Sequence, residues 1–258
     1  MKIKFVGVGG AFAPISIGNS NMLLSQNGKN MMVDCGTTAP YILRDEWGVQ
    51  HTDIDSFWVS HLHSDHIGGL EHYAFMRYFV PIRDQQGTII KPKLYTVRVL
   101  MQELWENSLR GGLESVEGQI TSLTDFFDCK PIEPNGNFEW EGYQFQPVQT
   151  IHVMAGYIFR YSYGLLIKNI GTAKSAFITT DTQFAPYQLQ QFYKADIIFH
   201  DCETLPYKSH VHAHYSDLKT LPDDVKSKMW LYHYSKAIDS CKEDGFAGFV
   251  EKGQEFEI

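Results

Sequence analysis

Short apolar runs that alternate with polar positions dominate the first third of the chain, and each run ends near a Gly, Asn or Asp. A period of two residues between turn-forming residues is typical of β-strands. The pattern therefore predicts strands over Lys2–Val8, Asn21–Ser25 and Lys29–Asp34. A further apolar run, Phe57–Ser60, leads directly into a segment that is rich in histidine.

Helical and extended patterns alternate through the rest of the chain. Helical spacing predicts helices over Thr38–Trp47, Glu71–Val80, Val99–Leu109 and Pro186–Tyr193, and the start of another at Asp217–Leu221. We expect Gly111 and Gly112 to end the third of these helices. Strands are expected over Leu94–Val97, Phe138–Gln149, Gly156–Lys168, Ser175–Thr180, Asp196–His200 and Met229–His233. No linker or repeat interrupts the pattern, which indicates one domain over residues 1–258 with two sheets and helices outside them.

Two aromatic groups stand out. One group lies in the first half of the expected strand Gly156–Lys168 and consists of Tyr157, Phe159, Tyr161 and Tyr163. Residues two apart point to one side of a strand, so we expect this side to face the core or a second subunit. The other group lies on an expected helix and consists of Phe75, Tyr78 and Phe79. We expect it to pack on a sheet, with stacking on a ligand as the alternative.

Composition and charge narrow the classes of partner. With 43% hydrophobic and 20% charged residues, the chain is typical of a globular protein, and no apolar run is long enough to span a membrane. The net charge of −8 disfavours a partner made of long RNA or DNA, which needs a cationic surface. The four cysteines are far apart in the sequence and indicate reduced thiols in a cytoplasmic protein.

Four side chains of metal-ligand type follow the run Phe57–Ser60 within six positions: His61, His63, Asp65 and His66. Residues two apart in an extended segment point the same way, so His61 and His63 can reach one ion. Three further residues of this type come later: His152, Asp181 and His233. Imidazole and carboxylate ligands suit Zn²⁺, Mn²⁺ or Fe²⁺.

The His-x-His-x-Asp-His cluster, followed by Gly68 and Gly69, resembles the signature of the metallo-β-lactamase superfamily, and the later ligands occur in that family's order. The resemblance implies a four-layer αββα sandwich, an α/β fold, and hydrolysis by a metal-activated water. It implies two divalent ions, zinc first and manganese as the alternative. It places one ion on His61, His63 and His152, and the other on Asp65, His66 and His233, with Asp181 between them. It also implies that Asp34 orients a ligand.

A later segment is similar to the ribonuclease Z branch of this superfamily. There an apolar strand ends in an acidic residue, and a histidine about a dozen residues later donates a proton to the leaving oxygen. The matching residues are Asp201, which replaces the usual Glu, and His214; His212 is the second candidate donor. The resemblance thus implies a catalytic set of Asp65, Asp201 and His214. The span from His152 to Asp181 leaves no room for the branch's tRNA-binding arm.

The size and layout of the chain also resemble the phage-type phosphodiesterases that counter the Pycsar defence. This resemblance implies hydrolysis of 3′,5′-cyclic mononucleotides to linear monophosphates by a homodimer, in the host cytoplasm if a phage encodes the chain. The alternatives are a ribonuclease Z-like RNA-processing endonuclease and another hydrolase of the same fold. A nucleotide-binding protein without turnover is a further alternative, which measured turnover would exclude.

Overall fold

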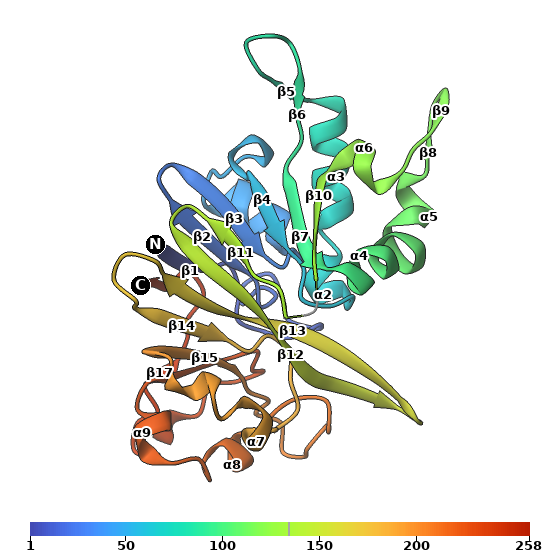
Figure 1. Cartoon of the computed structure of the whole chain (residues 1–258). Helices are drawn as coiled ribbons and strands as arrows, with labels where there is room; N and C mark the ends of the chain where they lie inside the picture. Colours follow the sequence, from blue (N-terminus) through green and yellow to red (C-terminus); the bar gives the residue numbers. More distant parts are fainter. Residues whose placement is uncertain (134) are drawn as a thin grey trace.

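Two seven-stranded β-sheets form the centre of the computed structural model, which describes residues 1–133 and 135–258 (Figure 1). In the order β10-β7-β4-β3-β2-β1-β18, the first sheet contains Asp128–Ile132, Lys93–Val97, Ser56–Trp58, Lys29–Val33, Met22–Gln26, Lys2–Phe5 and Glu255–Glu257. In the order β11-β12-β13-β14-β15-β16-β17, the second contains Phe138–Trp140, Tyr143–Ala155, Ile158–Asn169, Ser175–Ile178, Ile197–Asp201, Met229–Tyr232 and Gly248–Phe249. The expected two-sheet arrangement is therefore present.

Both sheets combine a parallel and an antiparallel part. Strands β3, β4, β7 and β10 pair in parallel in the first sheet, and β14 to β17 do so in the second. The remaining neighbours are antiparallel. Loops at the carboxyl ends of parallel strands are the usual place for functional residues in such sheets.

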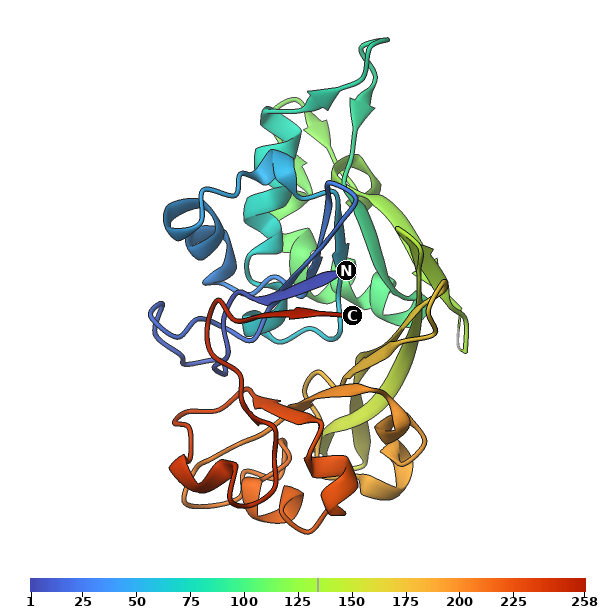
Figure 2. The ribbon, with the colours of Figure 1, turned by 90° about the vertical axis from the view of Figure 1, so that its left-hand side faces the viewer.

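Helices cover the outer faces of the two sheets (Figures 1 and 2). On the first sheet lie α3 (Leu70–Phe79), α4 (Arg98–Leu104) and α6 (Leu123–Phe126), and on the second α7 (Pro186–Leu189), α8 (Tyr215–Leu218) and α9 (Asp223–Lys226). The layers follow the predicted αββα order. Among the described residues, no helix has the length and apolar character that crossing a bilayer requires.

The remaining elements are short. The helical turns are α1 (Ala39–Tyr41), η1 (Ile42–Glu46), η2 (His51–Asp53), α2 (Ser64–Ile67), η3 (Trp105–Leu109), α5 (Arg110–Leu113), η4 (Phe192–Lys194) and η5 (Asp239–Cys241). Two small hairpins project from the helical side of the first sheet (Figure 1): β5 (Ile82–Arg83) with β6 (Ile89–Ile90), and β8 (Ser115–Val116) with β9 (Gln119–Ile120). The sequence pattern predicted neither hairpin.

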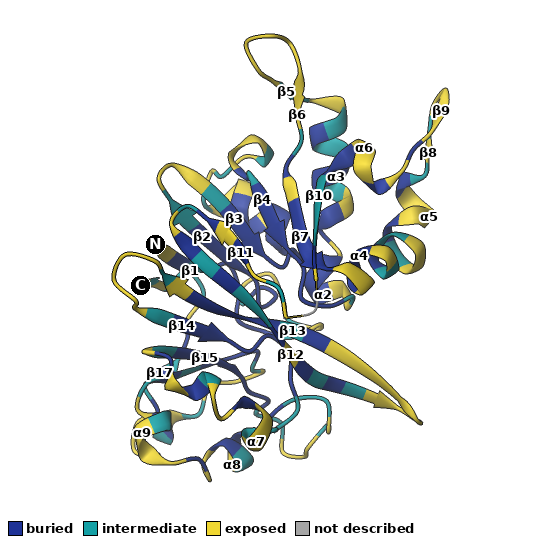
Figure 3. Ribbon diagram, in the orientation of Figure 1, coloured by how far each residue is buried: buried dark blue, intermediate teal, exposed yellow. Residues whose placement is uncertain are grey.

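Stacked aromatic rings hold the two sheets together. The ring of Phe138 lies 4.4 Å from that of Tyr95 and 5.6 Å from that of Trp58, so β11 packs directly on β7 and β4. Further along the interface, the rings of Phe5 and Phe199 are 5.1 Å apart. Figure 3 shows that buried residues concentrate in the two sheets. The core between them is therefore continuous from one end to the other.

Several expected element boundaries change in the structure. The expected strand Phe138–Gln149 is split into β11 and β12 by a turn at Glu141 and Gly142, which have φ angles of 47° and 83°. The glycines Gly111 and Gly112 do not end a helix, because the helical segment continues through η3 into α5. A Cβ atom on Gly112 would lie 2.1 Å from the Glu71 carboxylate, so this glycine permits close packing against α3 rather than a stop.

The aromatic stripe on β13 is not part of the core. Tyr157 is fully exposed, and Phe159 and Tyr161 retain 47% and 40% of their accessible surface. They lie near the tip of the β12–β13 hairpin, which extends beyond the sheet (Figure 3). The prediction of a core face is therefore wrong for these three residues, and the subunit interface stays a prediction. Phe75 and Tyr78 pack on Phe126 of helix α6 rather than on a sheet, and Phe79 is 63% exposed.

Loss of the Phe138 ring tests the role of the inter-sheet stack. We expect Phe138→Ala to lower the free energy of unfolding by about 3–5 kcal/mol, because the substitution leaves a cavity between the sheets. Urea denaturation at a fixed metal concentration measures the change. Phe79, which is 63% exposed, provides the control. Phe79→Ala should change stability by less than about 0.5 kcal/mol, and equal losses in the two variants would contradict the assignment.

Candidate metal centre

The seven predicted ligands meet where the two sheets bring together the ends of their parallel strands. The segment His61–His66 follows β4, Asp181 follows β14 and His233 follows β16, while His152 lies within β12. Six of the seven side chains are buried, and His63 is exposed. The structure therefore brings all seven residues into one centre.

The first group of ligand atoms belongs to His61, His63, His152 and Asp181, and these atoms all lie within 4.8 Å of one another. His63 Nδ1 faces His152 Nε2 at 3.0 Å. His61 Nε2 and His152 Nε2 each lie 3.6 Å from Asp181 Oδ2. Three imidazoles and a carboxylate thus converge on one point, as a divalent transition metal requires.

The second group consists of Asp65, His66, Asp181 and His233, again within 4.8 Å. His66 Nε2 lies 3.2 Å from Asp181 Oδ1 and 3.3 Å from Asp65 Oδ2. His233 Nε2 lies 3.4 Å from a carboxylate oxygen of each of these two aspartates. Asp181 belongs to both groups. This is the arrangement that the resemblance to the metallo-β-lactamase superfamily implied.

Hydrogen bonds outside the ligand atoms fix the imidazole rings. His66 Nδ1 donates to Asp34 Oδ2 at 2.7 Å, as predicted for Asp34. The Ser60 hydroxyl donates to the same oxygen at 2.6 Å and lies 3.0 Å from His61 Nδ1. His152 Nδ1 donates to the Val211 carbonyl at 2.8 Å. These partners select the tautomers that leave the opposite ring nitrogens free to bind a metal.

The backbone is strained at three of the loops that carry the centre. Asp34, Thr180 and His233 have φ angles of 59°, 52° and 68°, values that side chains other than glycine rarely adopt. Gly10 packs against His233 so closely that a Cβ atom there would lie 2.9 Å from Cε1 of the ring. Strain of this kind persists where surrounding contacts enforce it, and it is concentrated at functional sites.

The unpaired polar atoms of the centre fit a metal site. His61 Nε2, His66 Nε2 and Asp181 Oδ1 are buried and have no hydrogen-bond partner among the described residues. Buried polar atoms without partners are costly, so they require an explanation. All three belong to the ligand groups described above. Divalent cations at these groups would satisfy them.

The pKa values of the ligand residues also indicate that the centre requires positive charge. Burial lowers the pKa of His152 to about 4, so its imidazole is neutral at pH 7 and can bind a metal. Burial opposes ionisation of Asp181, but the imidazoles of His233 and His66 outweigh it and hold the pKa of Asp181 well below its usual range. Burial disfavours the charged form of His66, yet adjacent carboxylates, Asp181 first, raise its pKa. The centre thus contains ionised carboxylates that need cations beside them.

His212 joins the centre from the loop after β15. Its Nδ1 donates to Asp201 Oδ2 at 2.8 Å, and its ring stacks on His233 with 4.4 Å between centroids. Asp201 Oδ2 also accepts a hydrogen bond from the Thr182 amide at 2.8 Å, which fixes the carboxylate. Burial opposes the charged form of His212, but Asp201 outweighs it and raises the pKa of His212 to about 9.

His214 is engaged outside the centre. Its Nε2 donates to the Leu205 carbonyl at 2.9 Å, and its Nδ1 lies 2.7 Å from the Ser216 hydroxyl. It is also the N-cap residue of α8, where its side chain accepts a hydrogen bond from the Ser216 amide. Asp201, which the resemblance matched together with His214, is instead hydrogen-bonded to His212, the second candidate donor. The sequence signal for both was the same run of alternating histidines.

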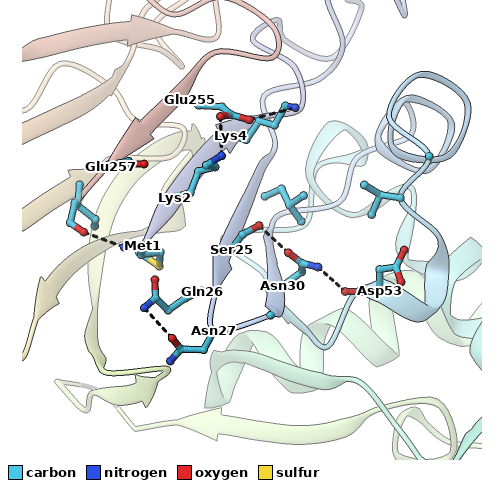
Figure 4. A pocket seen from close by; sticks show the side chains of 15 residues that line it. Met1, Lys2, Lys4, Ser25, Gln26, Asn27, Asn30, Asp53, Glu255 and Glu257 are labelled. Carbon is cyan, nitrogen blue, oxygen red and sulfur yellow. Dashed lines mark hydrogen bonds and ion pairs between the residues drawn. The ribbon is translucent and has the colours of Figure 1, made fainter.

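Two hollows differ in their relation to this centre. A cleft of about 540 Å³ adjoins His61, His63 and His152. A larger hollow of about 720 Å³ lies over β1, β2, β3 and β18 and contains none of the ligands (Figure 4). Its lysines pair with Glu255, Lys2 at 2.9 Å and Lys4 at 3.4 Å. Of these two hollows, the smaller cleft is the one placed to receive a molecule that reacts at the centre.

Comparison with solved structures places the fold. The metallo-β-lactamase fold protein YhfI from Bacillus subtilis is 16% identical, with a TM-score of 0.73 over 99% of this chain and 98% of that one. The short form of human tRNase Z (ELAC1) is 17% identical, with a TM-score of 0.71 over 100% of this chain and 99% of that one. The protein therefore has the metallo-β-lactamase fold, as predicted.

Comparison of sequences identifies the family. The family model described as "Anti-Pycsar protein Apyc1" matches residues 1–256. A relative from Paenibacillus harenae, "Anti-Pycsar protein Apyc1", is 35% identical over 262 aligned positions that cover 100% of each chain. The residues of the metal centre thus belong to a chain that matches this family over almost its whole length. The chain is a member of the anti-Pycsar protein Apyc1 family.

Proposed function

We propose that the protein is a metal-dependent phosphodiesterase that hydrolyses 3′,5′-cyclic mononucleotides to linear monophosphates and so counters cyclic-nucleotide antiphage signalling. The main support is the pair of ligand groups that share Asp181, with the His212–Asp201 pair directly beside them. The family description, anti-Pycsar, supports the cyclic-nucleotide substrate. Residues 1–258 would act as one catalytic domain.

The ligand groups define where two divalent ions, zinc or manganese, would bind. One ion would be held by His61, His63 and His152, the other by Asp65, His66 and His233, with Asp181 contributing to both. Such ions supply charge stabilisation at a phosphoryl group and activate water for its hydrolysis. The chain itself holds the imidazoles in fixed tautomers through Asp34, Ser60 and the Val211 carbonyl.

We assign the proton donor to His212 rather than His214. The Asp201 carboxylate orients the His212 ring and stabilises its charged form, which has a proton to give. The ring also lies against His233, so Nε2 of His212 is the nitrogen left to face a substrate. His214 has both ring nitrogens engaged in structural contacts and keeps only a role in starting α8.

An RNA-processing endonuclease is the second candidate, because the fold is similar to that of tRNase Z. The net charge of −8 disfavours a grip on long RNA. The segment between His152 and Asp181 consists of the end of β12, β13 and β14 with their turns, and this short span supports a smaller substrate. We therefore favour a small phosphodiester, hydrolysed in the cytoplasm or, for a phage gene, in the cytoplasm of the host.

Substrate choice tests the proposed function. We expect the protein, loaded with zinc or manganese, to bind about two ions per chain and to convert 3′,5′-cyclic mononucleotides to linear monophosphates. A chelator should abolish turnover, because the ligand groups hold the ions. Liquid chromatography of reactions with cyclic mononucleotides, cyclic dinucleotides, precursor tRNA and a chromogenic β-lactam measures the outcome. Efficient, specific cleavage of precursor tRNA would favour the second candidate instead.

Removal of His212 tests the proton donor. His212→Ala should lower kcat for a cyclic mononucleotide by about 10²–10⁴-fold while both metals stay bound. Bis(p-nitrophenyl) phosphate has a leaving group that needs little protonation, so its hydrolysis should fall much less. Asp201→Asn should give a milder loss with the same selectivity. His214→Ala is the matched control: if it reproduces the selective loss and His212→Ala does not, the assignment is reversed.

The exposed tip of the β12–β13 hairpin supports a homodimer, which we also propose. Its exposed side chains Tyr157 and Ile158 form an apolar surface that a monomer would leave in water. Light scattering should give about twice the chain mass of 29.6 kDa. Tyr157→Ser combined with Ile158→Ser should weaken the dimer. A monomer mass for the unmodified protein at micromolar concentration would refute the proposal.

A further inference from the structure

The cleft beside the metal centre has two walls of different chemistry. It lies between the helical segment formed by α4 and η3 and the strand β13, and it opens next to His61, His63 and His152. Its volume of about 540 Å³ is within the range of small-molecule sites. The residues that distinguish its walls are Glu103, Asn107, Phe159, Arg160 and Tyr161.

The proton donor is not part of this cleft. His212 is absent from the cleft lining and lies against His233, a ligand that the cleft also lacks. The cleft instead touches the three histidines of the other ligand group. A phosphodiester at the centre would therefore have a proton donor near His233 and a separate space beside His63. A nucleotide needs such a separation, since its base lies some distance from its phosphorus.

An ion pair crosses the cleft. Arg160 NH1 lies 3.9 Å from Glu103 Oε1, and the two side chains are 62% and 36% exposed. A contact this long between exposed side chains contributes little to stability, so either partner can turn to a ligand. Asn107, also on this wall, makes no side-chain hydrogen bond within the described residues. These polar groups are thus available at a place where the fold does not need them.

Aromatic rings line the same space. Phe159 and Tyr161 stack with their ring centroids 6.3 Å apart and an interplanar angle of 16°, and both stay partly exposed. Every nucleobase has a flat face that can contact such rings and an edge that carries N–H donors and acceptor atoms. The carboxylate of Glu103 can only accept, and the guanidinium of Arg160 can only donate.

We propose that this cleft binds the nucleobase of the substrate, and that Glu103 and Arg160 are its specificity-determining residues, Glu103 by accepting from a base N–H and Arg160 by donating to a base oxygen or ring nitrogen. The proposal rests on the proposed function. Both groups contact a part of the substrate that does not react. They therefore contribute binding that is equal before and in the transition state, and their loss raises KM more than it lowers kcat.

The test compares substrates with and without a base. For the metal-loaded protein, kcat/KM is measured with the cyclic mononucleotides of all four bases and with bis(p-nitrophenyl) phosphate. Glu103→Gln and Arg160→Met each should lower the ratio of cyclic-nucleotide to base-free turnover by at least about tenfold, the contribution of one charge-assisted hydrogen bond. The change should appear mainly in KM, and Glu103→Gln should alter the ranking of the four bases.

A second ion pair, at α5 directly after η3, provides the control. Arg110 NH2 lies 2.7 Å from Glu114 Oε1, outside the cleft. Glu114→Gln and Arg110→Met should leave the ratio unchanged. Unchanged ratios and base ranking in the Glu103 and Arg160 variants of an active enzyme would overturn the base site alone. A wild-type protein that hydrolyses the base-free ester but no cyclic mononucleotide would overturn the proposed function, and the base site with it.

Discussion

Two buried, ionised carboxylates, Asp65 and Asp181, impose the constraint on which the rest of the structure depends. Each is less than 3% exposed, and a buried carboxylate is tolerated only when positive charge or strong donors surround it. The fold meets this demand by bringing ligand histidines from both sheets to one point. It does so at the expense of backbone strain at Asp34, Thr180 and His233, each of order 1–3 kcal/mol. The sandwich is therefore organised around an electrostatic requirement as much as around its apolar core.

The layers and the ligand set could be predicted because both depend on local patterns. The alternation of a strand and the spacing of a helix both depend on residues that are close together in the sequence. His61 and His63 likewise share a side of one extended segment. His152, Asp181 and His233 come from distant parts of the chain, but their order along it matches a known signature. Six of the seven ligands follow the end of a strand, His152 lies within β12, and the family resemblance supplied their grouping.

Two kinds of feature could not be predicted from the sequence: the residue at which a helix begins, and the side chains that approach one another in the folded chain. The pattern predicted a helix from Asp217, but α8 starts at Tyr215, and this makes His214 its N-cap. The nearby His212 is then the one that reaches Asp201. In the same way, Gly112 looked like a helix stop because nothing in the sequence shows that Glu71 packs against it. The first error concerns a local helix start, and the second concerns a contact between residues far apart in the chain.

The two kinds of residue therefore have different freedom to change. The ligands are held by strand ends in both sheets and, for His152, by β12 itself. Replacing one of them leaves a buried charge without a partner or a strained loop without the contact that enforces it. Glu103 and Arg160 belong instead to a helical segment and a projecting hairpin, where side chains meet few structural demands. If the fold tolerates changes outside the ligand positions, two chains can share it at low identity, as this chain and tRNase Z do at 17%. Under the proposed function, the metal centre would set the class of bond that is broken, and the elements around the cleft would select the molecule that carries it.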